Sequence, residues 1–181
     1  MRIIGGVARS RRLVSPPGDA TRPMTDRMRE SLFSSIGVRL RGAAVLDLYA
    51  GSGSLGLEAL SRGAKTATFV EKDPKALTAL RANLATVGLG GDVVATDVDR
   101  YVDGCADRFD LAFVDPPYAA RLASVVDTMT KLAELLNDGG LAVVHRRHGE
   151  EWPVRITDLV LVDERRFGGA DLRRYEKERT W

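Results

Sequence analysis

The pattern of hydrophobic and polar positions becomes regular from residue 43 onward. Short apolar runs predict five strands, at residues 43–48, 66–71, 92–97, 110–115 and 140–146. Between them, apolar residues recur every three or four positions and predict helices at 55–63, 73–88, a short stretch through Tyr101, and 120–140. Because the runs are continuously apolar, they are typical of parallel strands buried on both faces. The order of elements predicts an α/β protein with a doubly wound sheet.

Two further segments complete the predicted fold. Residues 25–37 carry an apolar stripe at helical spacing, and Thr25 or Asp26 can cap the start of this helix. Residues 156–178 form two strand-like runs around a Gly-Gly turn, which predicts an antiparallel hairpin. We therefore expect a Rossmann-like sheet of about seven strands, mostly parallel, with a C-terminal antiparallel hairpin and a short N-terminal extension.

The loop after the first predicted strand, DLYAGSGSLG, places Gly51, Gly53 and Gly56 in a G-x-G-x-x-G frame before a helix. Glycines at these positions let the backbone turn tightly and approach a ligand closely. Glu71 ends the second strand, where a carboxylate can accept both hydroxyls of a ribose. These features alone fit a nicotinamide dinucleotide, and tight strand–helix packing without a ligand is the alternative.

Two more acids change the interpretation of this loop. Asp47 lies within the first strand, where a second carboxylate would repel a pyrophosphate but attract an ammonium or sulfonium group. Asp97 ends the third run and can accept a hydrogen bond from the exocyclic amine of adenine. Acids at three successive strand ends suit S-adenosyl-L-methionine (SAM), which carries a ribose, an adenine and a cationic amino-acid end. The chain lacks the G-K-[ST] of a P-loop, which argues against nucleotide triphosphate hydrolysis.

The fourth strand ends in the sequence DPPY, beside the expected reactive end of the cofactor. Pro116 and Pro117 have no N–H and ionised Asp115 only accepts, so this group offers acceptors without donors. It can bind an exocyclic –NH₂ through the Asp115 carboxylate and the Pro116 carbonyl, while Tyr118 supports a base flipped from its stack. The stretch predicts methyl transfer to an aryl amine. A proline-rich turn that only closes a strand is the alternative.

Charge is unevenly distributed along the 181 residues. Residues 1–41 contain nine arginines against three acids, whereas residues 42–181 carry 18 bases and 22 acids. Arginine pairs bidentately with phosphate, so the basic segment predicts contact with nucleic acid, and a solvated tail is the alternative. We therefore divide the chain into a basic N-terminal extension, 1–41, and a methyltransferase domain, 42–181.

Cysteine and histidine content restricts other chemistry. Cys105 is the only cysteine, so no intramolecular disulfide can form, which suits a reducing compartment. Cys105, His145 and His148 are too few for the usual zinc site, and we expect the two histidines on the surface after a strand, so no metal is predicted. The sequence has no apolar stretch of membrane-spanning length, and its N-terminus does not have the form of a signal peptide. The expected location is the cytoplasm.

The DPPY stretch resembles the [D/N/S]-P-P-[Y/F/W] signature of class I SAM-dependent amino-methyltransferases. Five segments in order resemble the RsmD family of bacterial 16S rRNA guanine-N2-methyltransferases: MRIIGGVARSRRL, TRPMTDRMRESLF, VLDLYAGSGSLGLEALSRGA, FVEKD and FDLAFVDPPY. The resemblance covers most of the chain and is less diagnostic near the C-terminus. It implies a Rossmann-like fold and SAM as the cofactor. It also implies that the target is a guanine in a hairpin loop of 16S rRNA, within a small-subunit assembly particle.

The resemblance also implies roles for particular residues. The transfer site would consist of Asp115, Pro116, Pro117 and Tyr118. The cofactor would contact Asp47, Tyr49, Gly51, Ser52, Gly53, Glu71, Lys72, Asp97 and Val98, with the segment Thr25, Asp26 and Arg27 packed over it. RNA contacts are expected from Arg9, Arg11, Arg12 and Arg22.

The residues themselves do not separate guanine N2 from adenine N6, because both are aryl amines that DPPY can bind. A DNA adenine-N6 methyltransferase is therefore an alternative, against which stands the lack of an obvious target-recognition domain. A catalytically silent RNA-binding protein is another, and the intact glycine loop and DPPY argue against it. An NAD-dependent dehydrogenase is the weakest, because no catalytic His or Tyr-x-x-x-Lys arrangement is evident near a strand end.

Overall fold

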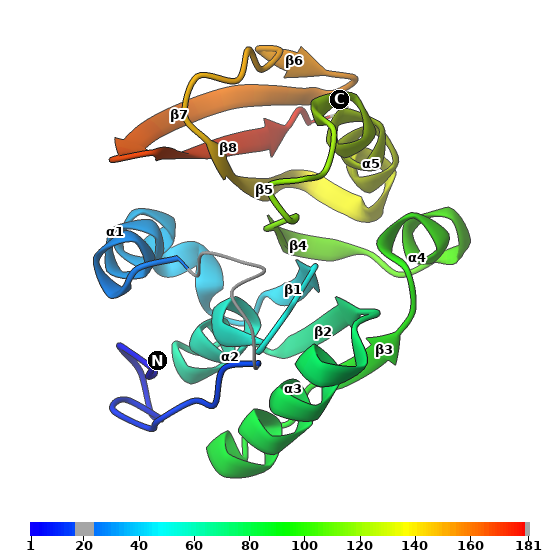
Figure 1. Cartoon of the computed structure of the whole chain (residues 1–181). Helices are drawn as coiled ribbons and strands as arrows, with labels where there is room; N and C mark the ends of the chain where they lie inside the picture. Colours follow the sequence, from blue (N-terminus) through cyan, green and yellow to red (C-terminus); the bar gives the residue numbers. More distant parts are fainter. Residues whose placement is uncertain (17–23, 180–181) are drawn as a thin grey trace.

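The computed structural model describes residues 1–16 and 24–179, which form a single sheet with helices on both faces (Figure 1). The helices are α1 (Asp26–Ile36), the 3₁₀ helix η1 (Gly37–Leu40), α2 (Ser54–Ser61), α3 (Pro74–Val87), α4 (Val98–Gly104) and α5 (Leu122–Leu135). The strands are β1 (Ala44–Leu48), β2 (Thr66–Glu71), β3 (Asp92–Ala95), β4 (Phe109–Val114), β5 (Leu136–Arg147), β6 (Arg155–Ile156), β7 (Leu159–Phe167) and β8 (Ala170–Lys177). None of the helices in these ranges is long and apolar enough to cross a membrane.

The strand order is β3-β2-β1-β4-β5-β8-β7-β6. The pairs from β3 to β5 are parallel, and β5 then pairs with β8 in the antiparallel direction, followed by β7 and β6. The predicted doubly wound sheet and its C-terminal hairpin are thus confirmed. The chain adds β2 and β3 on one side of β1, and then β4 and β5 on the other side. The carboxyl ends of β1 and β4 therefore flank the switch point, where ligands bind in such folds.

Continuous apolar strands are needed here because both faces of the sheet are covered. Val45, Phe69 and Phe113 belong to a core shared with α1, α2 and α3, and Phe33 of α1 packs on Phe113 with ring centroids 5.6 Å apart. Neighbouring residues on the same strands, such as Leu46, belong to a second core shared with α4 and α5. This alternation explains why the strand runs read as uninterrupted hydrophobic stretches.

The N-terminal residues 1–16 pack against α2 and α3 as part of the first core. Ile3 is fully buried, and the amides of Ile4 and Gly5 donate to the Glu58 carboxylate at 2.7 and 2.8 Å. Gly6 has φ +79°, and a Cβ there would lie 1.7 Å from the Ser61 carbonyl oxygen, so only glycine permits this approach. The segment is therefore bound to the sheet's helical layer rather than extended away from it.

Two predictions about the C-terminal half are wrong. The helix expected at 120–140 ends at Leu135, and residues 136–140 begin β5 instead. Gly139 has φ +74°, which no helix allows, and the Lys177 ammonium donates to the Ala133 and Leu136 carbonyls and so caps the helix end. The described sheet also has eight strands rather than about seven, because the two-residue strand β6 extends its far edge.

Candidate active site

Three carboxylates converge at the carboxyl ends of β1, β2 and β4. Asp47 is buried on β1, in register with Phe69 and Phe113, and its Oδ2 accepts the Gly56 amide at 2.9 Å. Burial raises the pKa of Asp47 well above its usual range, and the nearby charges of Asp115 and Glu71 raise it further. The charged form of Asp47 is therefore disfavoured in this site, and a cationic ligand beside it would favour the ionised carboxylate.

The glycine loop is held by close packing. Gly51 and Gly53 have φ of +56° and +78°, and a Cβ on Gly53 would lie 2.3 Å from Leu80 Cδ1. The Gly51 amide donates to Glu71 Oε2 at 2.8 Å. Ser52 is buried, and its carbonyl accepts the Asn83 amide at 2.9 Å. The predicted tight turn is present, and helix packing accounts for part of its glycine content.

Glu71 and Asp97 have structural partners as well as a place at the predicted cofactor site. Glu71 Oε1 accepts the amides of Lys72 and Asp73, each at 2.8 Å. Asp97 caps α4 by accepting the Asp99 amide at 3.0 Å and pairs with the Lys72 ammonium at 2.7 Å. This hydrogen bond from Lys72 lowers the pKa of Asp97.

The other predicted cofactor residues take different positions. Val98 is buried at the start of α4. Tyr49 has φ +59° in the loop, and its side chain packs into the α4–α5 core, where burial raises the pKa of its hydroxyl. Thr25 caps α1 by accepting the Met28 amide at 3.2 Å. Asp26 pairs with Arg29, and the Arg27 side chain is exposed.

The DPPY loop is anchored by two neighbouring residues of β5. His145 Nδ1 lies 2.8 Å from Asp115 Oδ1. Arg146 donates from Nη1 to the Pro117 carbonyl at 3.0 Å and from Nη2 to the Ala120 carbonyl at 2.9 Å, and its guanidinium also pairs with Glu150. Neither role was predicted from the sequence.

The expectation that His145 lies on the surface is wrong, because only 2% of this residue is exposed; Arg146 is also buried, at 1%. The pairing register of β4 with β5 is the signal that could have identified His145. Val114 of β4 pairs with Val144 of β5, so the next residues, Asp115 and His145, come side by side. The second histidine, His148, is exposed as expected and contacts Asp171 at 3.0 Å.

Tyr118 sits between two β5 side chains. Its hydroxyl lies 3.4 Å from His145 Nε2, and the Arg147 guanidinium lies 5.3 Å from its ring centroid. The loop therefore presents fixed acceptors and an aromatic ring with a guanidinium beside it. These groups limit the orientations in which a planar base can enter the site.

Two acceptors of the loop are left for a ligand. Asp115 Oδ1 contacts His145, and the Pro117 carbonyl accepts both Ala120 and Arg146. Within residues 1–16 and 24–179, no hydrogen bond is made to Asp115 Oδ2 or to the Pro116 carbonyl. These are the two groups that the sequence predicted as partners of an exocyclic amine.

The arginines of the N-terminal segment differ in their contacts. Arg9 and Arg12 are exposed. Arg11 donates to the Thr86 and Val87 carbonyls at the end of α3, at 2.6 and 3.1 Å, so part of its guanidinium already has a structural partner. Arg22 lies outside the described residues.

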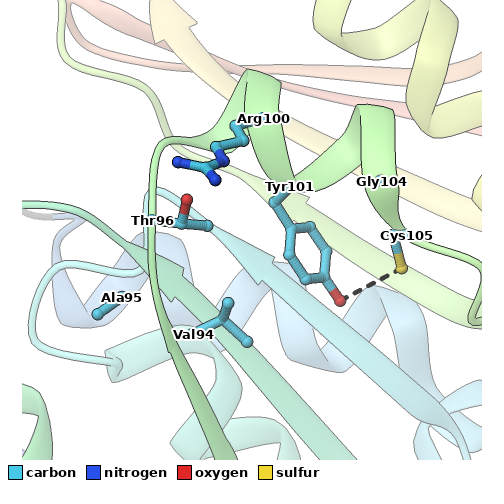
Figure 2. A pocket seen from close by; sticks show the side chains of 7 residues that line it. All are labelled: Val94, Ala95, Thr96, Arg100, Tyr101, Gly104 and Cys105. Atoms are coloured by element: carbon cyan, nitrogen blue, oxygen red, sulfur yellow. Dashed lines mark hydrogen bonds between the residues drawn. The ribbon is translucent and has the colours of Figure 1, made fainter.

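A shallow hollow lies between β3 and α4 (Figure 2), lined by Val94, Ala95, Thr96, Arg100, Tyr101, Gly104 and Cys105. Inside it, Cys105 Sγ donates to the Tyr101 hydroxyl at 3.4 Å. None of these residues belongs to the predicted site, so the hollow is separate from the carboxylate cluster. Among the described residues, no three His, Cys, Asp or Glu side chains are arranged so that they could hold a metal ion.

Comparisons with known proteins agree with this arrangement. A family model described as "Conserved hypothetical protein 95" matches residues 1–176. The chain is 35% identical over 179 residues to ribosomal RNA small subunit methyltransferase D of Escherichia coli K12, covering 98% of this chain and 90% of that protein. It also matches the structure of a hypothetical protein of Thermus thermophilus, TTHA0928, with a TM-score of 0.84 and 36% identity over 96% of this chain and 98% of that one. The chain therefore belongs to the RsmD family, as the sequence resemblance predicted.

Proposed function

We propose that this protein is a SAM-dependent methyltransferase that modifies the exocyclic N2 amine of a guanine in 16S rRNA of the small ribosomal subunit. The observation that carries the proposal is the pair of unused acceptors, Asp115 Oδ2 and the Pro116 carbonyl, next to Tyr118. An amine with two N–H groups is the natural ligand for two acceptors on a rigid loop.

The residues present fit SAM. Asp47 is a buried carboxylate that uses one oxygen for Gly56, and no hydrogen bond within the described residues reaches its Oδ1. It would hold the ammonium of the methionine end, Glu71 the ribose, and the segment from Lys72 to Val98 the adenine side. When bound, SAM supplies an electrophilic methyl group on a positively charged sulfur.

The loop residues would act by placing the amine. Two hydrogen bonds, to Asp115 and to the Pro116 carbonyl, orient the amine nitrogen so that its lone pair points at the methyl donor. The Asp115 carboxylate also stabilises the positive charge that develops on nitrogen during transfer and can accept its proton. Because His145 and Arg146 fix the loop beforehand, little reorganisation is needed on substrate binding.

The choice of RNA rests on the family and on charge. The curated relatives include several proteins named ribosomal RNA small subunit methyltransferase D, and the first 41 residues carry nine arginines. Guanine N2, 16S rRNA and a small-subunit particle as substrate are what the RsmD resemblance implies.

The test is labelled methyl transfer from SAM to small-subunit particles that lack the modification, alongside naked 16S rRNA and DNA. We expect label in 16S rRNA, mapped by mass spectrometry to N2 of one guanine, and loss of most turnover in Asp115→Ala. Label at adenine N6 of DNA would support the alternative enzyme. Absence of SAM binding by calorimetry would support a silent RNA-binding protein, and full turnover of folded Asp115→Ala would contradict the acceptor mechanism.

A further inference from the structure

Three exposed arginines near the DPPY loop have no acidic partner in the described part of the chain. Arg121 precedes α5, three residues after Tyr118, and Arg147 ends β5 with its guanidinium over the Tyr118 ring. Arg166 lies on β7, in register with Asp171 of β8, which is in turn in register with Arg146. Two strand spacings, about 10 Å, separate Arg166 from Arg146. Arg147 follows Arg146 directly, so Arg147 and Arg166 reach this end of the sheet from opposite faces.

Arginines further along the same hairpin are different. Arg165 and Arg174 both pair with Asp163, and Arg173 pairs with Glu164 and Asp171. Of the four arginines on β7 and β8, Arg166 is the one without an ion pair in the described part of the chain, and it lies at the end of the sheet where the DPPY loop lies.

We infer that Arg121, Arg147 and Arg166 form a phosphate-binding surface for the RNA nucleotides on either side of the methylated base. This inference rests on the proposed function. All three are arginines, whose planar guanidinium pairs with phosphate in a bidentate manner. Arg147 contacts the ring expected to support the base, which places its charge beside the nucleotide that enters the site.

The surface lies on the opposite side of the transfer site from the N-terminal segment (Figure 1). Residues 1–16 pack near α2 and α3, below β1 and β2 in the figure, whereas β7 and β8 lie at the top, beyond β5. The carboxyl ends of β1 and β4 lie between them. The three arginines are therefore separate from the N-terminal segment, whose Arg11 contacts the C-terminal end of α3.

The test uses the full chain with Arg121, Arg147 and Arg166 each changed to Gln, singly and together. The matched control is Arg108→Gln, an exposed arginine that immediately precedes β4, at the opposite end of the strand that leads to Asp115. The ligand is a 16S rRNA hairpin-loop fragment, with binding measured between low and moderate salt. Thermal unfolding and SAM binding by calorimetry verify that each variant is intact.

We expect the triple variant to bind the fragment at least tenfold more weakly, and its salt slope to fall by about 0.7 for each arginine removed. Arg147→Lys, which keeps the charge, retains most of the slope, and Arg108→Gln behaves like the wild type. If the triple variant keeps the wild-type affinity and slope, or if the wild type does not bind RNA, the inference is wrong. A wild type that binds RNA through these arginines but methylates nothing would contradict the proposed function and leave the surface supported.

Discussion

His145 joins Asp115 to Tyr118 through the two nitrogens of one buried ring. Its Nδ1 lies 2.8 Å from Asp115 Oδ1 and its Nε2 lies 3.4 Å from the Tyr118 hydroxyl. An ionised carboxylate can only accept, so Nδ1 carries the hydrogen, and Nε2 is then left to accept from the phenol. This tautomer fixes the acceptor and the ring of the transfer site relative to each other.

Replacing His145 with Ala should therefore lower kcat by about 10- to 100-fold, because small misplacement of a reacting group costs rates of this order. The affinity for SAM should stay unchanged, since His145 contacts the DPPY loop and not the glycine loop. His145→Asn keeps a donor near the position of Nδ1 and should recover part of the loss. His148→Ala, which changes an exposed histidine just beyond β5, is the control. Equal losses in both alanine variants would contradict a positioning role.

Replacing Asp47 with Asn should change the stability of the fold and the affinity for SAM in opposite directions. The folded-state pKa of Asp47 is raised by burial, so the charged form is disfavoured in the folded protein. The contribution of Asp47 to the free energy of unfolding is fully present below about pH 4, where its carboxyl is protonated. This contribution is lost as the pH rises through the raised folded-state pKa. The variant without ligand should thus be as stable as the wild type in acid and more stable at neutral pH, as measured by thermal unfolding.

The same Asp47→Asn variant should bind SAM about 2–5 kcal/mol more weakly at neutral pH, because the ammonium of the ligand loses its buried partner. Calorimetry measures this directly. Asp99→Asn, on α4, changes a carboxylate that bonds Thr128 and is the control. Unchanged SAM affinity in Asp47→Asn would remove Asp47 from the cofactor site.

Replacing Arg146 with Met should destabilise the fold by roughly 3–5 kcal/mol, because it leaves the Glu150 carboxylate and two loop carbonyls without their buried partner. Denaturant unfolding measures the loss. The double variant Arg146→Met with Glu150→Gln should recover part of it, since the unpaired acid is then neutral. If the double variant loses the sum of the two single changes, the pair is not coupled.

The arginines of the N-terminal segment should divide into two groups. Arg9→Gln with Arg12→Gln should weaken RNA binding and flatten its salt dependence without changing stability, because both side chains are exposed. Arg11→Gln should instead lower stability by about 0.5–1.5 kcal/mol, since it removes hydrogen bonds to two carbonyls at the end of α3. A stability loss in the first variant that matches the second would contradict this division.

Much of the fold follows from sequence periodicity, because each central strand is buried on both faces and each helix on one. The boundary between α5 and β5 does not, since Leu135 and Leu136 suit either state and the outcome depends on Lys177, more than 40 residues later. Likewise, some residues of the site can be identified from the sequence and others cannot. Asp115 and Asp47 are identified by their place at strand ends, but His145 becomes significant only through its pairing across β4 and β5.

The arrangement of β5 determines how misfolding can abolish activity. Adjacent residues of this strand serve the DPPY loop from opposite faces of the sheet: His145 contacts Asp115, and Arg146 contacts the Pro117 carbonyl. A shift of the strand by one position would exchange their faces. Misfolded chains would then keep a compact, helical appearance in spectroscopy and yet be inactive, so in preparations of this protein, specific activity is a more sensitive measure of correct folding than helix content.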